Sequence, residues 1–224
     1  MYPISLNLTE KPCLVVGGGT IASRKNQRLL KEAAKVTVVA PTVTEAIDQW
    51  HQQGKLTWEQ RSYQSGEFLA GYFLVFCATD NLQLNEEIAR AAKLAGALVN
   101  VITSPQESDF VVPASLVQGR LQLTVDTGGL SPALSRWIRQ DLAQRYHPGW
   151  GDFLASMAQL RDELKQTIPD TKVRTSLWRN LMTPEIWNLV INNEVEKAEN
   201  DIRHKISSAG IELPHRTSGD TRKI

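Results

Sequence analysis

The chain has 224 residues, of which 42% are hydrophobic, and its formal net charge at pH 7 is +1. This length suits one good core with a smaller second module, and the balanced charge argues against DNA or an anionic membrane as the main partner. We find no apolar stretch approaching the ~20 residues that span a bilayer, and no basic region and apolar core typical of a secretory signal. Cys13 and Cys77 each lie in an apolar run, so we expect buried thiols and a reducing, cytoplasmic compartment.

Short apolar runs alternate with amphipathic stretches over the first half of the chain. We predict strands at residues 13–16, 36–40, 56–59, 74–78, 97–101 and 110–112. We predict the clearest helices at residues 21–31, 43–53 and 82–94. Strands that are apolar throughout are typical of a parallel sheet covered on both faces, and right-handed crossovers between them give a doubly wound α/β fold of Rossmann type. In such a sheet, ligands bind outside the carboxyl ends of the strands.

A glycine-rich turn follows the first predicted strand. Residues 17–22 read Gly-Gly-Gly-Thr-Ile-Ala and open the first predicted helix, which fits the alanine variant of the dinucleotide-binding pattern. Glycines let the backbone approach a pyrophosphate, and the N–H groups and dipole at the helix start favour its negative charge. We therefore predict a dinucleotide held by Gly17, Gly18 and Gly19, with backbone contacts from Thr20 and Ile21.

Three further strand ends bear on the cofactor. Strand 36–40 leads into Ala40-Pro41-Thr42, where many such folds have a carboxylate that holds the ribose hydroxyls. No carboxylate stands at this strand end, and no Lys or Arg between residues 40 and 50 could attract a 2′-phosphate, so we favour NAD over NADP. Polar residues end the two later strands, and we predict that Thr79, Asp80 and Asn100 line the cofactor site.

Pro113 ends the alternating pattern. Residues 121–125 alternate apolar and polar side chains, as a half-buried strand does, and a loop then leads into a helix at residues 133–146 with Ser131 as its cap. From residue 150 to about 208 we predict only helices, broken at Pro169 and Thr183-Pro184, with Asp170 and Thr183 as caps. We expect the polar residues 215–224 to be disordered.

Seven short stretches between residues 3 and 140 occur in a specific order. They are Pro3-Ile4, Val15-Val16-Gly17-Gly18-Gly19, Ala22-x-Arg24-Lys25, Ala78-Thr79-Asp80, Asn100-Val101, Phe110-x-x-Pro113-Ala114 and Gly128-Gly129-x-Ser131-Pro132. In these stretches the chain resembles the precorrin-2 dehydrogenase/sirohydrochlorin ferrochelatase family, which is also the N-terminal module of siroheme synthase. The similarity in the helical tail is weak.

The resemblance implies an enzyme that oxidises precorrin-2 to sirohydrochlorin with NAD, on the route to siroheme. Some family members also insert iron into the product, so ferrous iron is a possible second substrate. The resemblance further implies a homodimer, with active sites between the nucleotide domain and the helical tail. We accordingly expect an NAD-binding domain at residues 1–113, a dimerisation segment at 114–149 and a helical domain at 150–224.

The resemblance also assigns contacts to individual residues. Cofactor contacts fall around Pro41 and Thr42. A tetrapyrrole with many carboxylates needs cations for its recognition. For each Arg or Lys named below, the alternative interpretation is an exposed charge on an amphipathic helix. The residues that we predict to bind the substrate are Arg24, Lys25, Arg120, Thr127, Gly128, Gly129, Ser131 and Arg136, with Arg139 a neighbour of Arg136 on the same helix. For Thr127 the simplest role is to fix its loop, and for Ser131 to cap the helix.

One position departs from the family pattern. The family has Asn-Val-x-Asp, with an acid/base role for the Asp, whereas this chain has Asn100-Val101-Ile102-Thr103. A threonine hydroxyl cannot cycle as a carboxylate does. Either the proton leaves to water or to a substrate carboxylate, or Asp109 reaches the same space, or one activity is lost. Metal insertion is the more doubtful activity, because it needs a base to remove the pyrrole N–H protons.

Two other classes of protein are alternatives to this enzyme. A non-catalytic NAD-binding regulatory module is the alternative, and Thr103 is its best support. A short-chain reductase is discounted, because none of the four tyrosines is followed four residues later by a lysine. We expect no tightly bound metal, since the four histidines (His51, His147, His204 and His215) have no metal-ligand spacing.

Overall fold

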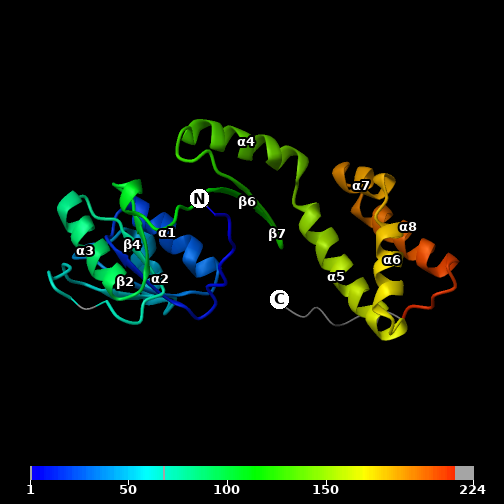
Figure 1. The fold of residues 1–224 in the computed structure, drawn as a ribbon, viewed down its shortest axis with the longest axis horizontal. Helices are drawn as coiled ribbons and strands as arrows, with labels where there is room; N and C mark the ends of the chain where they lie inside the picture. Colours follow the sequence, from blue (N-terminus) through cyan, green and yellow to red (C-terminus); the bar gives the residue numbers. More distant parts are fainter. Residues whose placement is uncertain (1, 68, 215–224) are drawn as a thin grey trace. The chain divides into compact units, whose positions relative to one another are not determined.

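The computed structural model describes residues 2–67 and 69–214. The chain forms two compact units, Met1–Val112 and Pro113–Ile224, whose elements are labelled in Figure 1. The prediction of disorder for residues 215–224 lies outside the described residues.

The first unit contains a five-stranded parallel sheet in the order β3-β2-β1-β4-β5. The sheet consists of β1 (Pro12–Val16), β2 (Lys35–Val39), β3 (Thr57–Glu59), β4 (Leu74–Cys77) and β5 (Leu98–Val101). The chain runs outward from β1 to β3 and then crosses back to β4, so the order reverses between β1 and β4. This topology confirms the predicted doubly wound α/β fold, and it predicts a ligand site at the carboxyl ends of β1 and β4.

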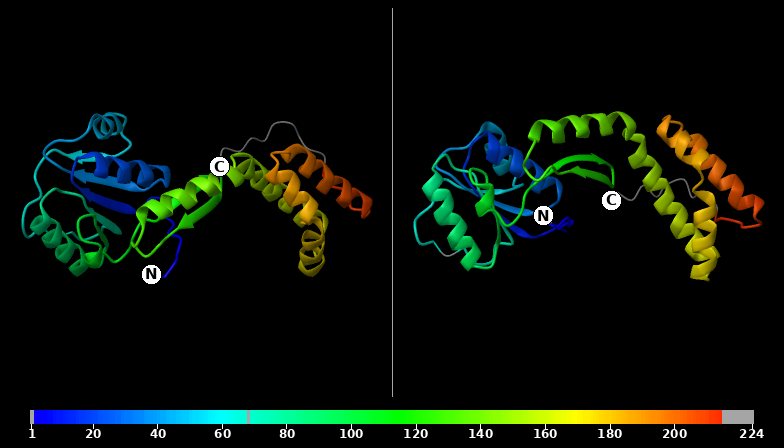
Figure 2. Two further views of the ribbon diagram at one scale, coloured as in Figure 1. Left: turned by 90° about the horizontal axis from the view of Figure 1, so that it is seen from above. Right: turned by 45° about the horizontal axis from the view of Figure 1, so that its top comes forward.

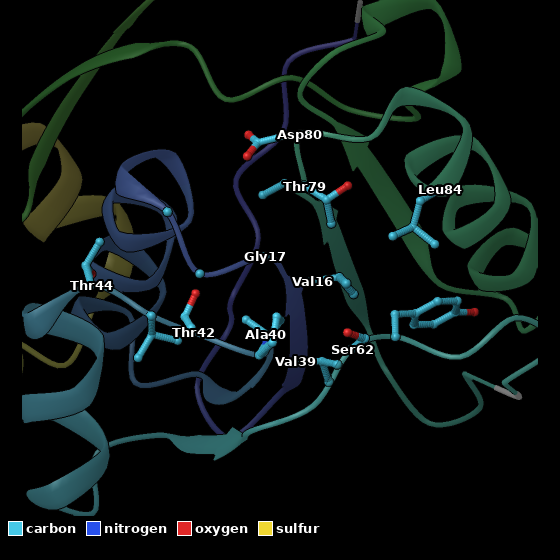
Figure 3. A pocket seen from close by; sticks show the side chains of 16 residues that line it. Val16, Gly17, Val39, Ala40, Thr42, Thr44, Ser62, Thr79, Asp80 and Leu84 are labelled. Atoms are coloured by element: carbon cyan, nitrogen blue, oxygen red, sulfur yellow. The ribbon is translucent and has the colours of Figure 1, made fainter.

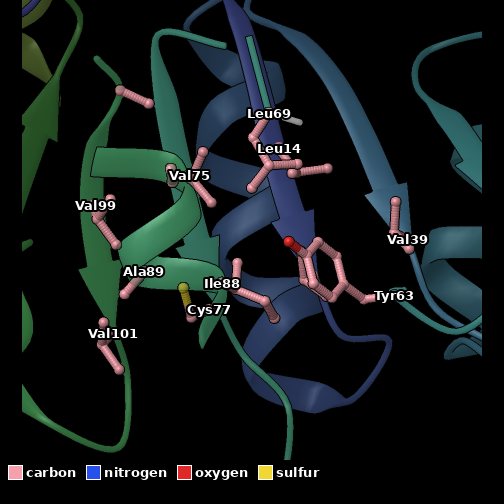
Figure 4. Packing of buried hydrophobic residues seen from close by; sticks show 13 residues of the cluster. Leu14, Val39, Tyr63, Leu69, Val75, Cys77, Ile88, Ala89, Val99 and Val101 are labelled. Carbon is pink, nitrogen blue, oxygen red and sulfur yellow. The ribbon is translucent and has the colours of Figure 1, made fainter. Parts of the chain in front are cut away.

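Helices cover both faces of this sheet, and each face has its own apolar core. One core joins β1 and β4 to α3 (Leu82–Leu94), and Figure 4 shows Leu14 and Val75 packed with Ile88 of that helix. The other core includes residues of α1 (Thr20–Lys31) and α2 (Glu45–Gln52). Cys13 and Cys77 are free and fully buried, as predicted, and burial raises the pKa of Cys13 to about 11 and that of Cys77 to about 12.

The predicted strand at residues 110–112 is wrong. After β5 and a short 3₁₀ turn (Pro105–Glu107), the chain doubles back along the exposed edge of the sheet, held largely by side chains. Asp109 N–H donates to the Val99 carbonyl (2.8 Å), and the Asn100 amide donates to the Phe110 carbonyl (2.9 Å). The apolar run arises because Phe110 packs edge-to-face on Phe76, with ring centres 5.4 Å apart, and not because it pairs as a strand.

The second unit begins with an antiparallel hairpin of β6 (Ala114–Gln118) and β7 (Leu121–Val125). The sequence pattern predicted β7 but missed β6. Helix α4 (Pro132–Arg145) packs on this hairpin. As predicted, Ser131 caps α4, since its hydroxyl accepts a hydrogen bond from Leu134 N–H (3.3 Å) and Pro132 occupies the first turn.

Four further helices complete the second unit. They are α5 (Gly149–Thr167), α6 (Thr171–Leu181), α7 (Pro184–Ile191) and α8 (Val195–Ser208). Figure 2 shows α7 and α8 (orange to red) side by side and next to α5, with Phe153, Leu160, Ile186 and Ile202 in the shared core.

The breaks at Pro169 and Thr183-Pro184 are confirmed, and so is the Asp170 cap, which accepts from Lys172 N–H (2.7 Å). Thr183 stands at the cap position of α7 but makes no capping bond with its side chain. A further break at Asn193, with φ 63°, was not predicted. Among the described residues, no helix combines the length and apolarity of a bilayer span.

Candidate functional site

A cavity of about 540 Å³ lies at the carboxyl ends of β1, β2 and β4 in the first unit (Figure 3). Its walls are the strand ends and the loops that follow them. They comprise residues 16–19, 39–44 and 78–80 together with Ser62, Tyr63 and Leu84. This is the position that the reversal of strand order predicts for a ligand.

The three glycines at the start of the cavity serve different purposes. Gly17 has φ +126°, and a Cβ there would lie 2.2 Å from the Ala78 carbonyl oxygen. A Cβ on Gly18 would lie 1.9 Å from the Thr42 carbonyl oxygen, so this glycine lets two loops touch. A Cβ on Gly19 would meet no protein atom within 4 Å. The fold therefore requires the first two glycines, whereas the third leaves open space for a ligand.

Helix α1 begins at Gly19 without a capping side chain. The N-cap residue has extended backbone, and the first turn of the helix contains no acidic residue. Free N–H groups and the positive end of the helix dipole therefore lie at Gly19, Thr20 and Ile21, and of these three residues Gly19 lines the cavity. Open backbone at a helix start is what a pyrophosphate needs, so these residues fit a dinucleotide cofactor.

The loop after β2 forms a second wall, with Pro41 and Thr42 exposed in it. The indole N–H of Trp58 donates to the Ala40 carbonyl (2.9 Å), and Thr44 N–H donates to the Gly18 carbonyl (2.9 Å). The loop is therefore fixed at both ends. No Lys or Arg is among the residues that line the cavity.

Thr79 and Asp80 line the cavity after β4, but their polar groups differ in availability. The Thr79 hydroxyl and N–H both donate to Asn85 Oδ1 (2.7 and 3.2 Å), so this side chain is used inside the protein. Asp80 is exposed and has no hydrogen-bond or ion-pair partner within residues 2–67 and 69–214. Asp80 thus has a carboxylate that is free to interact with a ligand, whereas Thr79 forms part of the cavity wall without a free N–H group.

Asn85 is a site residue that the sequence analysis missed. It is fully buried, and its Nδ2 donates to the Thr79 carbonyl (2.9 Å) and to the Thr103 hydroxyl oxygen (3.2 Å). Asn85 therefore joins the end of β4 to the end of β5. A signal was present, because Asn85 lies on the same helix face as the apolar Ile88 and Ala89 of α3.

Asn100 and Asp109 do not line the cavity. The buried Asn100 amide holds the Phe110 carbonyl, as described above. The Asp109 carboxylate accepts from Val99 N–H (3.0 Å) and lies 3.4 Å from Lys93 Nζ. Val99 is in the amino-terminal half of β5, whereas Thr103 follows its carboxyl end, so Asp109 and Thr103 have different surroundings.

Arg24 and Lys25 lie on α1 outside the cavity wall. Lys25 Nζ is 5.5 Å from the centre of the Phe76 ring. Burial and then repulsion from Arg28 and Arg24 lower the pKa of Lys25. Among the described residues, neither Arg24 nor Lys25 has a carboxylate within ion-pair distance. They are cations available to an anionic ligand.

The remaining predicted substrate residues belong to the second unit. The Thr127 hydroxyl accepts from Ser131 N–H (3.2 Å) and lies 3.0 Å from the Ser135 hydroxyl, which fixes the loop before α4. Gly128 and Gly129 are exposed in this loop, and so are the side chains of Arg120 and Arg136. Within the described part of the chain, no group of three or more His, Cys, Asp or Glu could hold a metal ion.

Comparisons with known proteins agree with this geometry. Residues 4–114 match a family model described as putative NAD(P)-binding, and residues 149–206 match the sirohaem synthase dimerisation region. Siroheme synthase of Nitrosococcus oceani is 35% identical over 197 residues, which is 88% of this chain and 42% of that protein. Siroheme synthase of Methylobacillus flagellatus is 32% identical over 213 residues, 95% of this chain and 45% of the relative.

In one solved structure, the match covers most of both chains. SirC, precorrin-2 dehydrogenase, superposes with a TM-score of 0.74 at 28% identity, covering 89% of this chain and 99% of that chain. By contrast, the chain spans less than half the length of the siroheme synthases that it matches.

The parallel sheet, the glycine turn and the open start of α1 define an NAD(P)-binding protein of Rossmann type. Within that class, the chain belongs to the precorrin-2 dehydrogenase/sirohydrochlorin ferrochelatase family, and it matches part of the length of siroheme synthases. The matched dimerisation region begins at residue 149, whereas the sequence predicts the dimerisation segment at 114–149.

Proposed function

We propose that the protein is an NAD-dependent dehydrogenase that oxidises precorrin-2 to sirohydrochlorin in siroheme biosynthesis. The observation that carries the proposal is the open backbone at Gly19 and the uncapped start of α1, in a chain similar to SirC over nearly the whole length of that protein. NAD, when bound, supplies the acceptor for a hydride from the reduced macrocycle.

The cofactor would be held mainly by backbone. The N–H groups at Gly19, Thr20 and Ile21 would bind the pyrophosphate, and Pro41 and Thr42 would border the adenosine ribose. NAD is favoured over NADP because no cation lines the cavity. Arg61, on the loop after β3, is already paired with Glu59 and Glu67, each at 2.6 Å, and so is not free for a 2′-phosphate.

The substrate would be recognised through its carboxylates. Arg24 and Lys25 supply unpaired cations in the first unit, and the preformed loop at Thr127–Ser131 adds hydroxyl and backbone donors in the second. Arg120 and Arg136 are exposed and available for the same purpose. Iron insertion is not part of the proposal, because Thr103 takes the place of the Asp to which the family resemblance assigns the acid/base role in metal insertion.

The proposed assembly is a homodimer of chains with an NAD-binding domain at 1–113, a dimerisation segment at 114–149 and a helical domain at 150–224. It is supported by apolar side chains on α4 that are exposed in the described part of the chain. Leu134 and Trp137 are 46% and 63% exposed, three positions apart on the helix.

Anaerobic incubation of the purified chain with precorrin-2 and NAD tests the activity. We expect NADH absorbance at 340 nm to rise together with the sirohydrochlorin spectrum, and NADP to support a much slower reaction. A non-catalytic NAD-binding module is the second candidate, favoured by Thr103. Tight NAD binding without any turnover would overturn the dehydrogenase and support that module.

A further inference from the structure

The dehydrogenation needs a group that accepts a proton. Oxidation of the macrocycle breaks a C–H bond, whose hydrogen and electron pair pass to NAD as a hydride, and forms a new ring double bond as a second hydrogen leaves as a proton. Resting on the function proposed above, we infer that the carboxylate of Asp80 accepts this proton and then releases it to water.

Among the described residues that line the cavity, Asp80 carries the one carboxylate. Besides Asp80, the ionisable side chain in the described lining is that of Tyr63, and it is 8% exposed. Figure 4 shows its hydroxyl directed toward Leu14 in the apolar core, where it has no hydrogen-bond partner in the described structure. The threonine hydroxyls of the lining do not deprotonate in the working range of an enzyme. Asp80 alone combines exposure to the cavity with basicity.

The backbone that carries Asp80 is held firmly on both sides. Thr79 is fixed by three hydrogen bonds to the buried Asn85. Asn81 caps α3 by accepting from Leu84 N–H (3.0 Å), and its own N–H donates to the Thr79 hydroxyl (3.3 Å). The Asp80 carboxylate, in contrast, makes none of these bonds, and Figure 3 shows it pointing away from Leu84. A fixed backbone with a free carboxylate suits proton transfer, since the base needs no reorganisation.

The two other candidates for this role are committed elsewhere. Thr103 accepts a hydrogen bond from Asn85, and a threonine hydroxyl does not take up and release a proton as a carboxylate does. Asp109 is held by Val99 N–H and Lys93 along the edge of β5. Because β4 and β5 are parallel neighbours with Cys77 beside Val101, the residues that follow them emerge at the same edge of the sheet. The structure thus assigns the base to the end of β4, one strand away from Thr103.

The test compares Asp80→Asn and Asp80→Ala with the unmodified full chain in the anaerobic assay with precorrin-2 and NAD. General base catalysis contributes roughly 10²–10⁴ in rate, so we expect kcat to fall by at least about 100-fold in both variants. NAD binding, measured by calorimetry, should be retained. Sodium formate should restore part of the rate to Asp80→Ala, which has space for a small carboxylate, and should not help Asp80→Asn. The matched control is Asp48→Asn on the outer surface of α2, which should leave kcat unchanged.

The outcomes separate the two proposals. Turnover by the unmodified chain with Asp80→Asn at the same rate would overturn the assignment of Asp80 and leave the dehydrogenase intact. Loss of rate that formate does not relieve in Asp80→Ala, together with weakened NAD binding, would also overturn it in favour of a structural role. No turnover by the unmodified chain would overturn the dehydrogenase, and the assignment of Asp80 with it.

Discussion

Gly17 and Gly19 lie two positions apart, yet different requirements make each a glycine. At Gly17 the backbone is left-handed and packed against the Ala78 carbonyl, so a side chain there conflicts with the protein itself. At Gly19 the backbone has an ordinary extended conformation beside open space, so a side chain there conflicts only with a ligand. This difference lets stability be separated from cofactor binding.

We predict that Gly19→Ser keeps the stability of the protein and weakens NAD binding about ten- to a hundredfold, the equivalent of one lost charge-assisted hydrogen bond. Serine is a favourable cap, and its hydroxyl would compete for the N–H groups of α1. Gly17→Ala should instead lower the free energy of unfolding by at least ~2 kcal/mol through strain and overpacking. Urea unfolding and NAD titration measure the two quantities. Unchanged NAD affinity in Gly19→Ser would contradict the placement of the pyrophosphate.

Single residues also mark where sequence reasoning succeeded and where it stopped. The glycine turn could be predicted because strand, turn and helix are adjacent in the chain. The burial of Asn85 on an apolar helix face could be predicted too, but its role could not, because its bonds reach Thr79 and Thr103, the latter 18 positions away, and depend on β4 lying beside β5. Asp109 was considered as a base because it is close to Thr103 in sequence, but the chain reverses between them.

At the scale of elements, the edge of the parallel sheet is closed by a returning segment. The outer strand β5 would otherwise present unpaired backbone groups. Ser108 and Asp109 side chains accept from Val101 and Val99 N–H groups (2.8 and 3.0 Å), and the Asp109 N–H donates to the Val99 carbonyl. The side chains of Ser108 and Asp109 are therefore explained by their bonds to the backbone of β5, without a catalytic role.

Replacement of Asp109 by alanine tests that explanation. Asp109→Ala removes the acceptor for Val99 N–H and the partner of Lys93, so we expect unfolding free energy to fall by about 1–3 kcal/mol. The rate of NADH formation under folding conditions should stay close to that of the unmodified chain. Glu107→Ala, in the exposed 3₁₀ turn of the same segment, is the control and should change stability by less than ~0.5 kcal/mol. Lost turnover without lost stability would restore Asp109 as a catalytic candidate.

Element prediction failed where apolar residues serve packing without pairing. Residues 110–112 are apolar because Phe110 covers Phe76, and no alternation distinguishes this from a short buried strand. Strand β6 was missed because the sequence pattern changes at Pro113. Residues 114–118 form a strand through their antiparallel pairing with β7, which the local sequence does not reveal. The sheet strands β1 to β5, in contrast, were all predicted, although β3 (Thr57–Glu59) is not an apolar run.

At the scale of the whole molecule, the two units differ in how far sequence could describe them. The fold and ligand edge of the first unit follow from patterns in the chain. In the second unit, the exposed apolar residues of α4 become visible only once the helix is packed on its hairpin. The assignment of this unit to dimerisation rests on the resemblance and on the match at residues 149–206.

We predict that the chain is a dimer and that Leu134→Glu combined with Trp137→Glu makes it a monomer. Two carboxylates on the exposed apolar stripe could not be buried between copies without a large desolvation penalty. Light scattering after size exclusion should give twice the 25.0 kDa chain mass for the unmodified protein and the single mass for the variant. Gln140→Glu, also exposed on α4, should remain dimeric. A dimer that survives the double substitution would place the interface elsewhere.

The close approach of Gly18 to Thr42 limits how the cofactor preference of this protein can be redesigned. Acceptance of NADP would be favoured by a guanidinium in the loop at residues 40–44, where it could pair with the 2′-phosphate. That loop rests on Gly18 through the Thr42 carbonyl and through the bond from Thr44 N–H, so its length and path are set by the phosphate turn. Side-chain exchange at Pro41 or Val43 leaves this contact in place, whereas an insertion would lift the loop and deform the turn that we propose holds the pyrophosphate.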